Sequence, residues 1–319
     1  MIDYSKFVEN SRKWLSQYIK DNHLQSICIG ISGGIDSTVS CAIASPVCKE
    51  LNIPLIGRSL PTTTNKIEES KVAQLVGDAF CDDFKTVNIS EECQKLIHEL
   101  ELVEGKMTRL QEGNVKARVR MIYLRHLASI HKGVVLDNDN FTEWNLGFWT
   151  VGGDSPMDIN LGLHYLWKTE IYELANYLLE QYDIEWKAFD DFETLEIAEK
   201  ADIACAKYEA LKASIELTPT DGNGVSNSDC EQFGLDNYEQ VDDVLKTVYY
   251  NHYPNSIRVL SEADFNKEYT RLIDSYNEQG VGKVMILHQN TKYKRKESPI
   301  KPTKEDLGLE DLELRGLEL

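Results

Sequence analysis

The stretch GISGGIDSTVS, residues 30–40, places glycines, serines and one aspartate between two apolar runs. The run before it, SICIGI, is β-branched like a buried strand, whereas the run after it, TVSCAIASPVCKEL, is typical of a helix. Glycine at such a junction indicates either a tight turn, because glycine adopts positive φ cheaply, or an anion site. In an anion site, Gly33 and Gly34 would let backbone N–H groups and the helix N-terminus approach a phosphate.

Strand-like and helical patterns alternate through the first half of the chain. The runs IPLIGRSL, FKTVNI and GVVLDN are separated by helical patterns, of which NVKARVRMIYLRHLASIH is the strongest. This alternation predicts an α/β fold with a doubly wound parallel sheet, whose ligands bind at the carboxyl ends of the strands. Beyond residue 160 the chain is mainly helical. In the strongest helical pattern, the apolar positions expected to face the core are Val115, Val119, Ile122 and Leu127.

The composition is that of an ordinary globular protein, with 42% hydrophobic and 27% charged residues among 319. The net charge of −19 argues against nucleic-acid binding, which needs a basic face. No apolar run approaches the ~20 residues of a membrane span, and the first residues lack a signal-peptide pattern. We therefore expect a cytoplasmic protein that contacts no membrane. The seven cysteines form no CxxC pair, which favours scattered thiols over a metal site or disulfides.

The cations are concentrated in the runs GRSLPTTTNK, GNVKARVR, LWKTE and NTKYKRKE. Each run alone is typical of a solvated helix face, but together they favour one shared anion site. An acidic protein can bind a polyphosphate when it gathers its cations locally and recruits a divalent metal.

The segment SGGIDS follows a strand and opens a helix, which is the context that a phosphate-binding loop requires. It is not a Walker loop, because no GK[ST] follows, and it lacks the GxGxxG of dinucleotide-binding folds. It resembles the loop of the ATP pyrophosphatases, which binds the β- and γ-phosphates of ATP and releases them together as pyrophosphate. The resemblance implies that the glycines make room for this leaving group and that Asp36 holds the Mg²⁺ that neutralises it.

Further segments occur in the order seen in the ammonia-dependent NAD synthetases. They are GNVKARVRM, NFTEWNLGFWT, GDSPMDIN, KTEIYELANYL, TPTDGNG and KYKRKESPIKP. The chain resembles this family from about residue 5 to residue 302. The resemblance implies an adenine nucleotide α-hydrolase-like fold with a helical C-terminal half, usually a homodimer. It also implies ATP-dependent amidation of deamido-NAD with ammonia through an acyl-adenylate, with release of AMP and pyrophosphate.

The family's functional positions carry over to this chain one by one. The implied magnesium ligands are Asp36 and Glu143, and the implied deamido-NAD contacts are Arg118, Asp158 and Lys294. The implied ATP-binding residues are Gly30, Ile31, Ser32, Gly33, Gly34, Ile35, Asp36, Ser37, Asn138, Lys168 and Thr220. The substrate carboxylate supplies the nucleophile, so catalysis would come from positioning and charge neutralisation, with Asp36 and Lys168 in the central roles.

Three positions depart from the family pattern, and a fourth has two interpretations. Asn138 replaces a hydroxyl residue, and Val151 replaces a lysine that contacts the dinucleotide. Tyr293 replaces the histidine that usually precedes the lysine at position 294. Asp154, in the segment GGDS, would help deprotonate incoming ammonium or would merely cap a turn.

We expect a single domain over residues 1–302, followed by an acidic C-terminal tail, residues 303–319, that frays or docks a partner. About 25 residues exceed the compact bacterial pattern and are interpreted as a helical insertion over residues 183–213. The segment TPTDGNGVSNSDCEQFG, within residues 217–234, is rich in turn-forming residues and is either a mobile active-site lid or a surface linker.

Other activities remain open at the level of the sequence. The chain has no room for a glutaminase domain, so free ammonia is the expected nitrogen source, although a glutaminase acting in trans stays possible. A second candidate is another adenylating amidotransferase with the same loop, either GMP-synthetase-like or tRNA-modifying. A third is a nucleotide-binding regulator that no longer turns over, since Asn138 and Val151 depart from the pattern.

Overall fold

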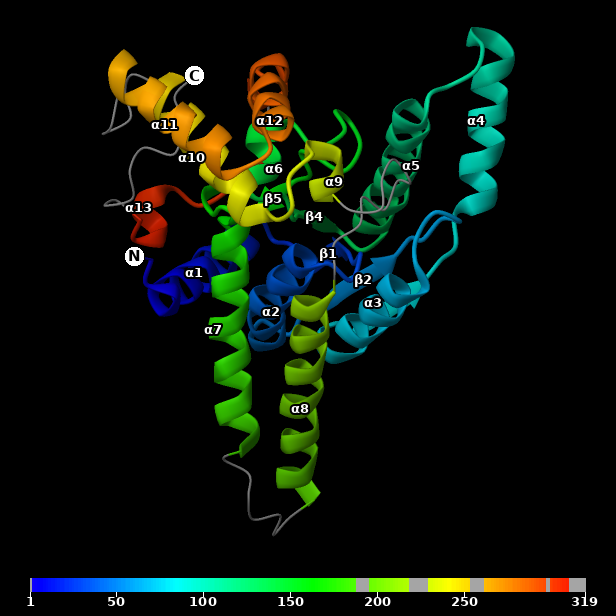
Figure 1. Ribbon diagram of the computed structural model, residues 1–319. Coiled ribbons are helices and arrows are strands. Elements are labelled where there is room, and N and C mark those ends of the chain that lie inside the picture. The colour runs from blue at the N-terminus through cyan, green and yellow to red at the C-terminus, as the bar shows by residue number, and fades with distance from the viewer. Residues whose placement is uncertain (1, 188–194, 218–228, 253–260, 297–298, 310–319) are drawn as a thin grey trace.

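The computed structural model describes residues 2–187, 195–217, 229–252, 261–296 and 299–309 (Figure 1). Its centre is a parallel five-stranded sheet in the order β3-β2-β1-β4-β5. The strands are β1 Ser26–Gly30, β2 Leu55–Ser59, β3 Asp83–Thr86, β4 Gly133–Asp137 and β5 Ile159–Asn160. The chain leaves β1 toward β2 and β3 and then crosses to β4 on the other side of β1, which makes the β1/β4 junction the switch point where ligands bind in such sheets. The predicted doubly wound α/β fold is confirmed.

Helices cover both faces of this sheet, because its central strands are apolar on both sides. In β1, Ile27 and Ile29 pack with α1 Tyr4–Asp21, α2 Ile35–Glu50 and α3 Ile67–Phe80. Cys28 points to the opposite face and packs with α4 Ser90–Glu104 and α5 Arg109–Ile130. The alternation follows from the two-residue period of a strand.

The expectation that Ile122 faces the core is wrong. Val115 and Val119 are buried, but Ile122 is 59% exposed. In the C-terminal half of α5, Leu124 and Ala128 are buried instead, and Leu124 lies against β1 at Gly30. Residues 122 and 124 lie about 200° apart around a helix, so only one of them can face the sheet. Periodicity alone could not indicate which side of α5 the sheet contacts.

A third apolar cluster joins the C-terminal helices to the sheet edge that carries the site. It contains Phe141 and Trp144 of α6 Phe141–Leu146 together with residues of four further helices. These are α9 Asp229–Phe233, α10 Tyr238–His252, α11 Glu262–Ser275 and α12 Glu278–Asn290. The C-terminal half is therefore built onto α6, directly beside the carboxyl end of β4.

The helices α7 Lys168–Lys187 and α8 Leu195–Glu216 lie side by side as a long hairpin that projects from the body (Figure 1). The expected insertion, residues 183–213, falls on the end of α7 and most of α8. The last turn of α8 is tied to the loop after β1, because Ser214 Oγ donates to Gly33 O over 3.1 Å and lies 2.7 Å from Thr38 Oγ1. One end of this hairpin thus supports the loop from which the fold was predicted.

The C-terminal segment returns to the body. Ile300 bridges Ile159 in β5, and the helix α13 Lys304–Leu307 packs on α1, where Leu307 and Leu309 are buried. The described start of the expected tail therefore docks on its own chain, and residues 310–319 lie outside the described residues. Within the described ranges, no helix combines the length and the apolar character needed to cross a membrane.

Candidate active site

The loop between β1 and α2 can accept only glycine at position 33. Gly33 has φ +89°, and a Cβ added there would lie 2.6 Å from the Glu69 carbonyl oxygen on α3. Gly34 then caps α2, and its N–H donates to Ser32 Oγ over 3.1 Å. The N-terminus of this 16-residue helix opens onto a cavity lined by the loop. The tight turn brings the helix N-terminus to the cavity, which is the geometry that the predicted anion site requires.

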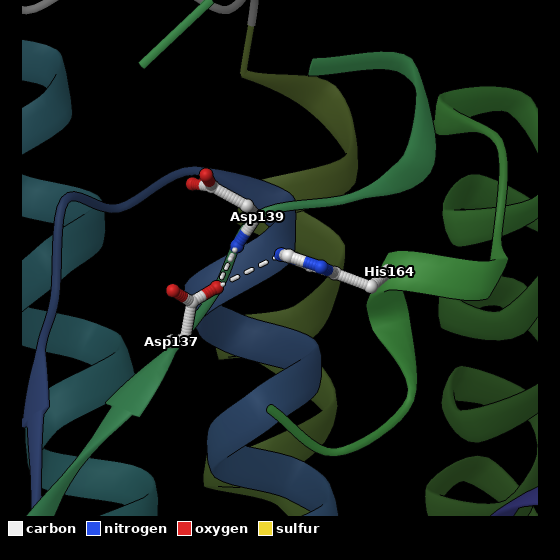
Figure 2. A group of neighbouring side chains, drawn as sticks. All are labelled: Asp137, Asp139 and His164. Carbon is white, nitrogen blue, oxygen red and sulfur yellow. Dashed lines mark hydrogen bonds and ion pairs between the residues drawn. The ribbon is translucent and has the colours of Figure 1, made fainter. Parts of the chain in front are cut away.

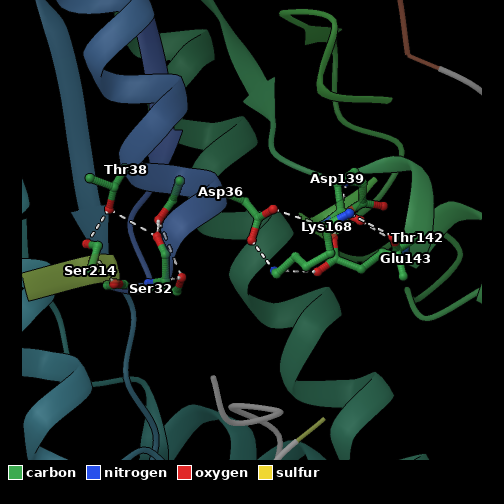
Figure 3. Close-up of polar contacts among 12 residues, drawn as sticks. Ser32, Asp36, Thr38, Asp139, Thr142, Glu143, Lys168 and Ser214 are labelled. Carbon is green, nitrogen blue, oxygen red and sulfur yellow. Dashed lines mark hydrogen bonds and ion pairs between the residues drawn. The ribbon is translucent and has the colours of Figure 1, made fainter. Parts of the chain in front are cut away.

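Three charged side chains meet beside this loop (Figure 3). Lys168, the first residue of α7, places Nζ 2.5 Å from Asp36 Oδ2 and 3.3 Å from Glu143 Oε1. Asn140 donates to the other oxygen of Asp36 over 2.8 Å. Burial lowers the pKa of Lys168, but Asp36 and Glu143 outweigh it and hold that pKa well above its usual range. The ammonium stays charged, and two carboxylates from different helices converge on one cation.

Two cavities adjoin at this cluster. The first, of 290 Å³, is lined by the loop together with Arg58, Arg120 and Asn138. The second, of 650 Å³, is lined by residues of α5, by the segment after α6 and by Lys294. The residues that line both cavities are Ser32, Asp139, Glu143 and Asp154. Two ligands held in the separate cavities would meet at this acidic wall.

The second cavity holds the two cations that the resemblance assigned to the dinucleotide. Arg118 donates from Nε and Nη2 to the Val151 carbonyl oxygen, over 3.3 and 3.2 Å. Lys294 Nζ donates to the carbonyl oxygens of Gly147 and Trp149 and lies 5.3 Å from the centre of the Trp149 ring. Burial lowers the pKa of Lys294. Arg118 thus reaches the backbone at the position where the family pattern has a lysine.

Asp154 serves as a turn cap and also faces both cavities. Its Oδ1 accepts the Thr150 N–H over 2.6 Å, which is the turn-capping role considered from the sequence. Burial raises the pKa of this carboxyl, although Arg120 and Lys294 oppose the effect. A carboxyl with a raised pKa at the shared wall has the properties of a proton acceptor for a cationic substrate.

Of the remaining sequence-predicted residues, Asn138 lies at a cavity and Asp158 does not. Asn138 donates to Gly30 O over 3.3 Å and lines the first cavity. Asp158 accepts the Val135 N–H over 2.8 Å, forms an ion pair with Arg125 and lines neither cavity, so its dinucleotide role stays a prediction. Thr220 lies outside the described residues.

Sequence reasoning missed two residues at the cavities. Arg120 donates to Leu60 O over 3.1 Å and to Asn65 Oδ1 over 3.3 Å, and burial lowers its pKa. It lies two positions after Arg118, and the 200° between them places the two guanidinium groups in different cavities. Asp139 lines both cavities, and burial together with Asp137 and Glu143 raises its pKa well above the usual range. Its signal was the segment DND directly after a predicted strand.

A second polar cluster, formed by Asp137, Asp139 and His164, lies behind the wall (Figure 2). His164 Nε2 is 3.3 Å from Asp137 Oδ1, and Lys301 Nζ is 3.5 Å from His164 Nδ1. Figure 2 shows the Asp139 carboxylate turned away from the imidazole. Asp137 also accepts hydrogen bonds from Asp139 N, Ser155 Oγ, Met157 N and Asn160 Nδ2. With both oxygens of Asp137 occupied and a lysine beside the imidazole, the cluster fixes the turn after β4 and is a poor cation site.

Comparison with known proteins agrees with this geometry. A sequence model described as NAD synthase matches residues 7–298. The NH3-dependent NAD+ synthetase of Mycoplasma genitalium is 34% identical over 179 residues, which cover 56% of this chain and 69% of the relative. The NH3-dependent NAD+ synthetase of Thermoplasma volcanium is 28% identical over 249 residues, which cover 78% of this chain and 86% of the relative.

Solved structures show the same fold. The NMN synthetase of Francisella tularensis has a TM-score of 0.66 at 20% identity and covers 95% of this chain and 100% of that one. The NH3-dependent NAD synthetase of Campylobacter jejuni has a TM-score of 0.55 at 20% identity, and the match covers 86% of this chain and 95% of that one.

Proposed function

The chain belongs to the NAD synthase family, and we infer from this premise that it is an NH3-dependent NAD+ synthetase, a ligase. Its substrates are ATP, deamido-NAD and ammonia. The observation that carries the assignment is the position of the buried Lys168 between two carboxylates at the cavities: Glu143 lines both cavities and Asp36 lines the first. A reaction that joins two bound substrates needs this arrangement.

The first cavity suits ATP. The N–H groups at the start of α2 and the Lys168 ammonium would hold the β- and γ-phosphates, which leave together as pyrophosphate. Arg120 adds a buried guanidinium to the same cavity. The α-phosphorus would then lie at the shared wall, within reach of a group held in the second cavity.

The second cavity suits deamido-NAD, whose phosphates would meet Arg118 and Lys294. An oxygen of the nicotinate carboxylate attacks the α-phosphorus, the bond from that phosphorus to the pyrophosphate oxygen breaks, and an acyl-adenylate forms. Ammonia then attacks the acyl carbon, the bond to the adenylate oxygen breaks, and AMP leaves. Asp154, which lines both cavities and whose pKa burial raises, would take the proton that separates ammonium from ammonia.

Asp36 and Glu143 would hold Mg²⁺. They are hard oxygen donors at the mouth of the phosphate loop, and they already converge on the positive charge of Lys168, so the donor set fits a divalent cation. When bound, the metal neutralises charge on the polyphosphate. The protein's own part is to hold the two carboxylates and the lysine in register.

We also propose that the chain acts as a homodimer, with residues 1–302 as one domain. The helices α4 and α5 pack together and leave apolar side chains exposed, namely Leu102, Val103, Leu110, Ile122 and Ile130. A self-association surface explains this exposure. Sedimentation of the wild-type protein and of Ile122→Glu tests it: a monomeric wild type rules out the dimer.

The activity test incubates the protein with ATP, Mg²⁺, ammonium and deamido-NAD and measures NAD, AMP and pyrophosphate. Equal amounts of the three products support the assignment, and ADP in place of AMP contradicts it. Tight ATP binding without turnover would favour a regulator. Replacing ammonium by glutamine tests for a partner glutaminase, and replacing deamido-NAD by nicotinic acid mononucleotide tests the specificity of the second cavity.

A further inference from the structure

We propose that Asp242, on α10, is a positioning residue that holds Lys168 and Glu143 in place for the reaction. The proposal rests on the function proposed above. Asp242 itself is not among the described residues that line either cavity. Asp242 lies 73 residues or more from its partners in sequence and belongs to the helical C-terminal half.

The contacts of Asp242 converge on the start of α7. One oxygen accepts the Thr169 N–H over 3.0 Å, and the other accepts the Thr142 hydroxyl over 2.5 Å. That same hydroxyl oxygen accepts the Lys168 N–H over 2.8 Å. The first N–H groups of a helix lack partners within the helix, so side chains must supply them. Asp242 and Thr142 supply two acceptors here from outside α7.

The partners of Asp242 adjoin the reacting centre directly. Thr142 precedes Glu143 on α6, and Thr169 follows Lys168 on α7. Figure 3 shows Thr142 close to Glu143 and Lys168. The Lys168 ammonium also lies 5.2 Å from the ring centre of Tyr238, the first residue of α10. One carboxylate therefore fixes the backbone beside two of the three charged groups that meet at the wall.

This carboxylate is unusually placed for a structural group. Asp242 is 0% exposed, and burial raises its pKa while the hydrogen bonds from Thr142 and Thr169 oppose that rise. Burial of a charge is costly unless hydrogen bonds and geometry compensate. Asparagine would keep the size, but one of its terminal atoms is a donor, so it could not accept from both partners. The site uses two acceptors at once.

The test compares Asp242→Asn and Thr142→Val with Asp243→Asn. Asp243 is the next residue of α10, and it accepts from Arg271 over 2.8 and 3.0 Å and from Tyr276 over 2.8 Å, without a contact to α7 among the described residues. The measurements are kcat for NAD, the dissociation constant of ATP with Mg²⁺, and the denaturant midpoint of each variant.

We expect Asp242→Asn and Thr142→Val each to lower kcat roughly 10- to 100-fold, as misplaced catalytic and metal-binding groups do. Both should weaken binding of ATP with Mg²⁺, and Thr142→Ser should restore kcat. Asp243→Asn should lower the denaturant midpoint and leave kcat within twofold of wild type. A merely structural role for Asp242 would lower the midpoint without changing kcat of the folded protein.

The proposal is overturned if both test variants keep kcat within twofold of wild type, or if Asp243→Asn loses as much kcat as Asp242→Asn. If the wild-type protein makes no NAD, the proposed function fails, and binding of ATP with Mg²⁺ then decides the role of Asp242 by itself. Weakened binding in Asp242→Asn upholds that role, and unchanged binding rejects it.

Discussion

Gly33→Ala should damage both folding and ATP use. The added Cβ would lie 2.6 Å from the Glu69 carbonyl oxygen, and ordinary contact begins at 3.4 Å, so the loop and α3 must separate by 0.8 Å. Alanine at φ +89° is also strained. Backbone strain costs about 1–3 kcal/mol and overpacking about 1–3 kcal/mol. We therefore expect a loss of about 2–6 kcal/mol in the free energy of unfolding.

The effect on ATP follows from the same displacement. A shift of about 1 Å in a catalytic group costs as much as ~100-fold in rate. The loop leads directly into Asp36, so we expect kcat/KM for ATP to fall roughly 10- to 100-fold. Pyrophosphate release at varied ATP concentration measures it, and denaturant unfolding measures the stability.

Gly105→Ala separates strain from the clash. Gly105 has φ +87°, and a Cβ added there meets nothing within 4 Å. We expect this variant to lose about 1–3 kcal/mol and to keep its kcat/KM for ATP. A clash at position 33 is ruled out if Gly33→Ala is no less stable than Gly105→Ala and uses ATP as well as wild type does.

Three further predictions concern charged residues. Asp36→Asn and Glu143→Gln should each abolish pyrophosphate release with an unchanged circular dichroism spectrum, since a hard cation needs charged oxygens. Normal turnover of Asp36→Asn at saturating Mg²⁺ would limit Asp36 to a structural role in the first turn of α2. Arg118→Ala should raise KM for deamido-NAD roughly 10- to 100-fold and leave KM for ATP unchanged. Val151→Lys should lower KM for deamido-NAD or leave it unchanged. An unaltered KM for deamido-NAD in Arg118→Ala would show that Arg118 does not contact this substrate. Burial lowers the pKa of Lys301 to about 8. Between about pH 8 and 10 the unfolded chain therefore binds one more proton than the folded chain, and the stability rises with pH. The denaturant midpoint of Lys301→Met should lack this part of the rise, and a pH profile identical to that of wild type would contradict the prediction.

The features that the sequence predicted well are local. The loop of residues 30–37 could be recognised because its glycines, its serines and Asp36 form one short continuous motif. The alternation of strands and helices around it predicted the parallel sheet. Lys168 was implied by the family resemblance of its segment, KTEIYELANYL, and the structure brings it to Asp36.

The features that the sequence could not supply depend on tertiary packing. Ile122 has helical spacing, but spacing does not indicate which side of α5 meets the sheet. Arg120 resembles any cation of a basic run until β2 and α5 enclose it beside the first cavity. Asp242 is an ordinary acidic residue of an amphipathic helix, and only the approach of α10 to α7 brings it to Thr169.

We propose that the carboxylate of deamido-NAD attacks the α-phosphorus of ATP at the wall between the two cavities. Deamido-NAD labelled with ¹⁸O in its nicotinate carboxylate tests this directly, with mass spectrometry of every product. We expect NAD formation with one ¹⁸O transferred to the phosphate of AMP and none to pyrophosphate. Unlabelled AMP, or label in inorganic phosphate released with ADP, would contradict it.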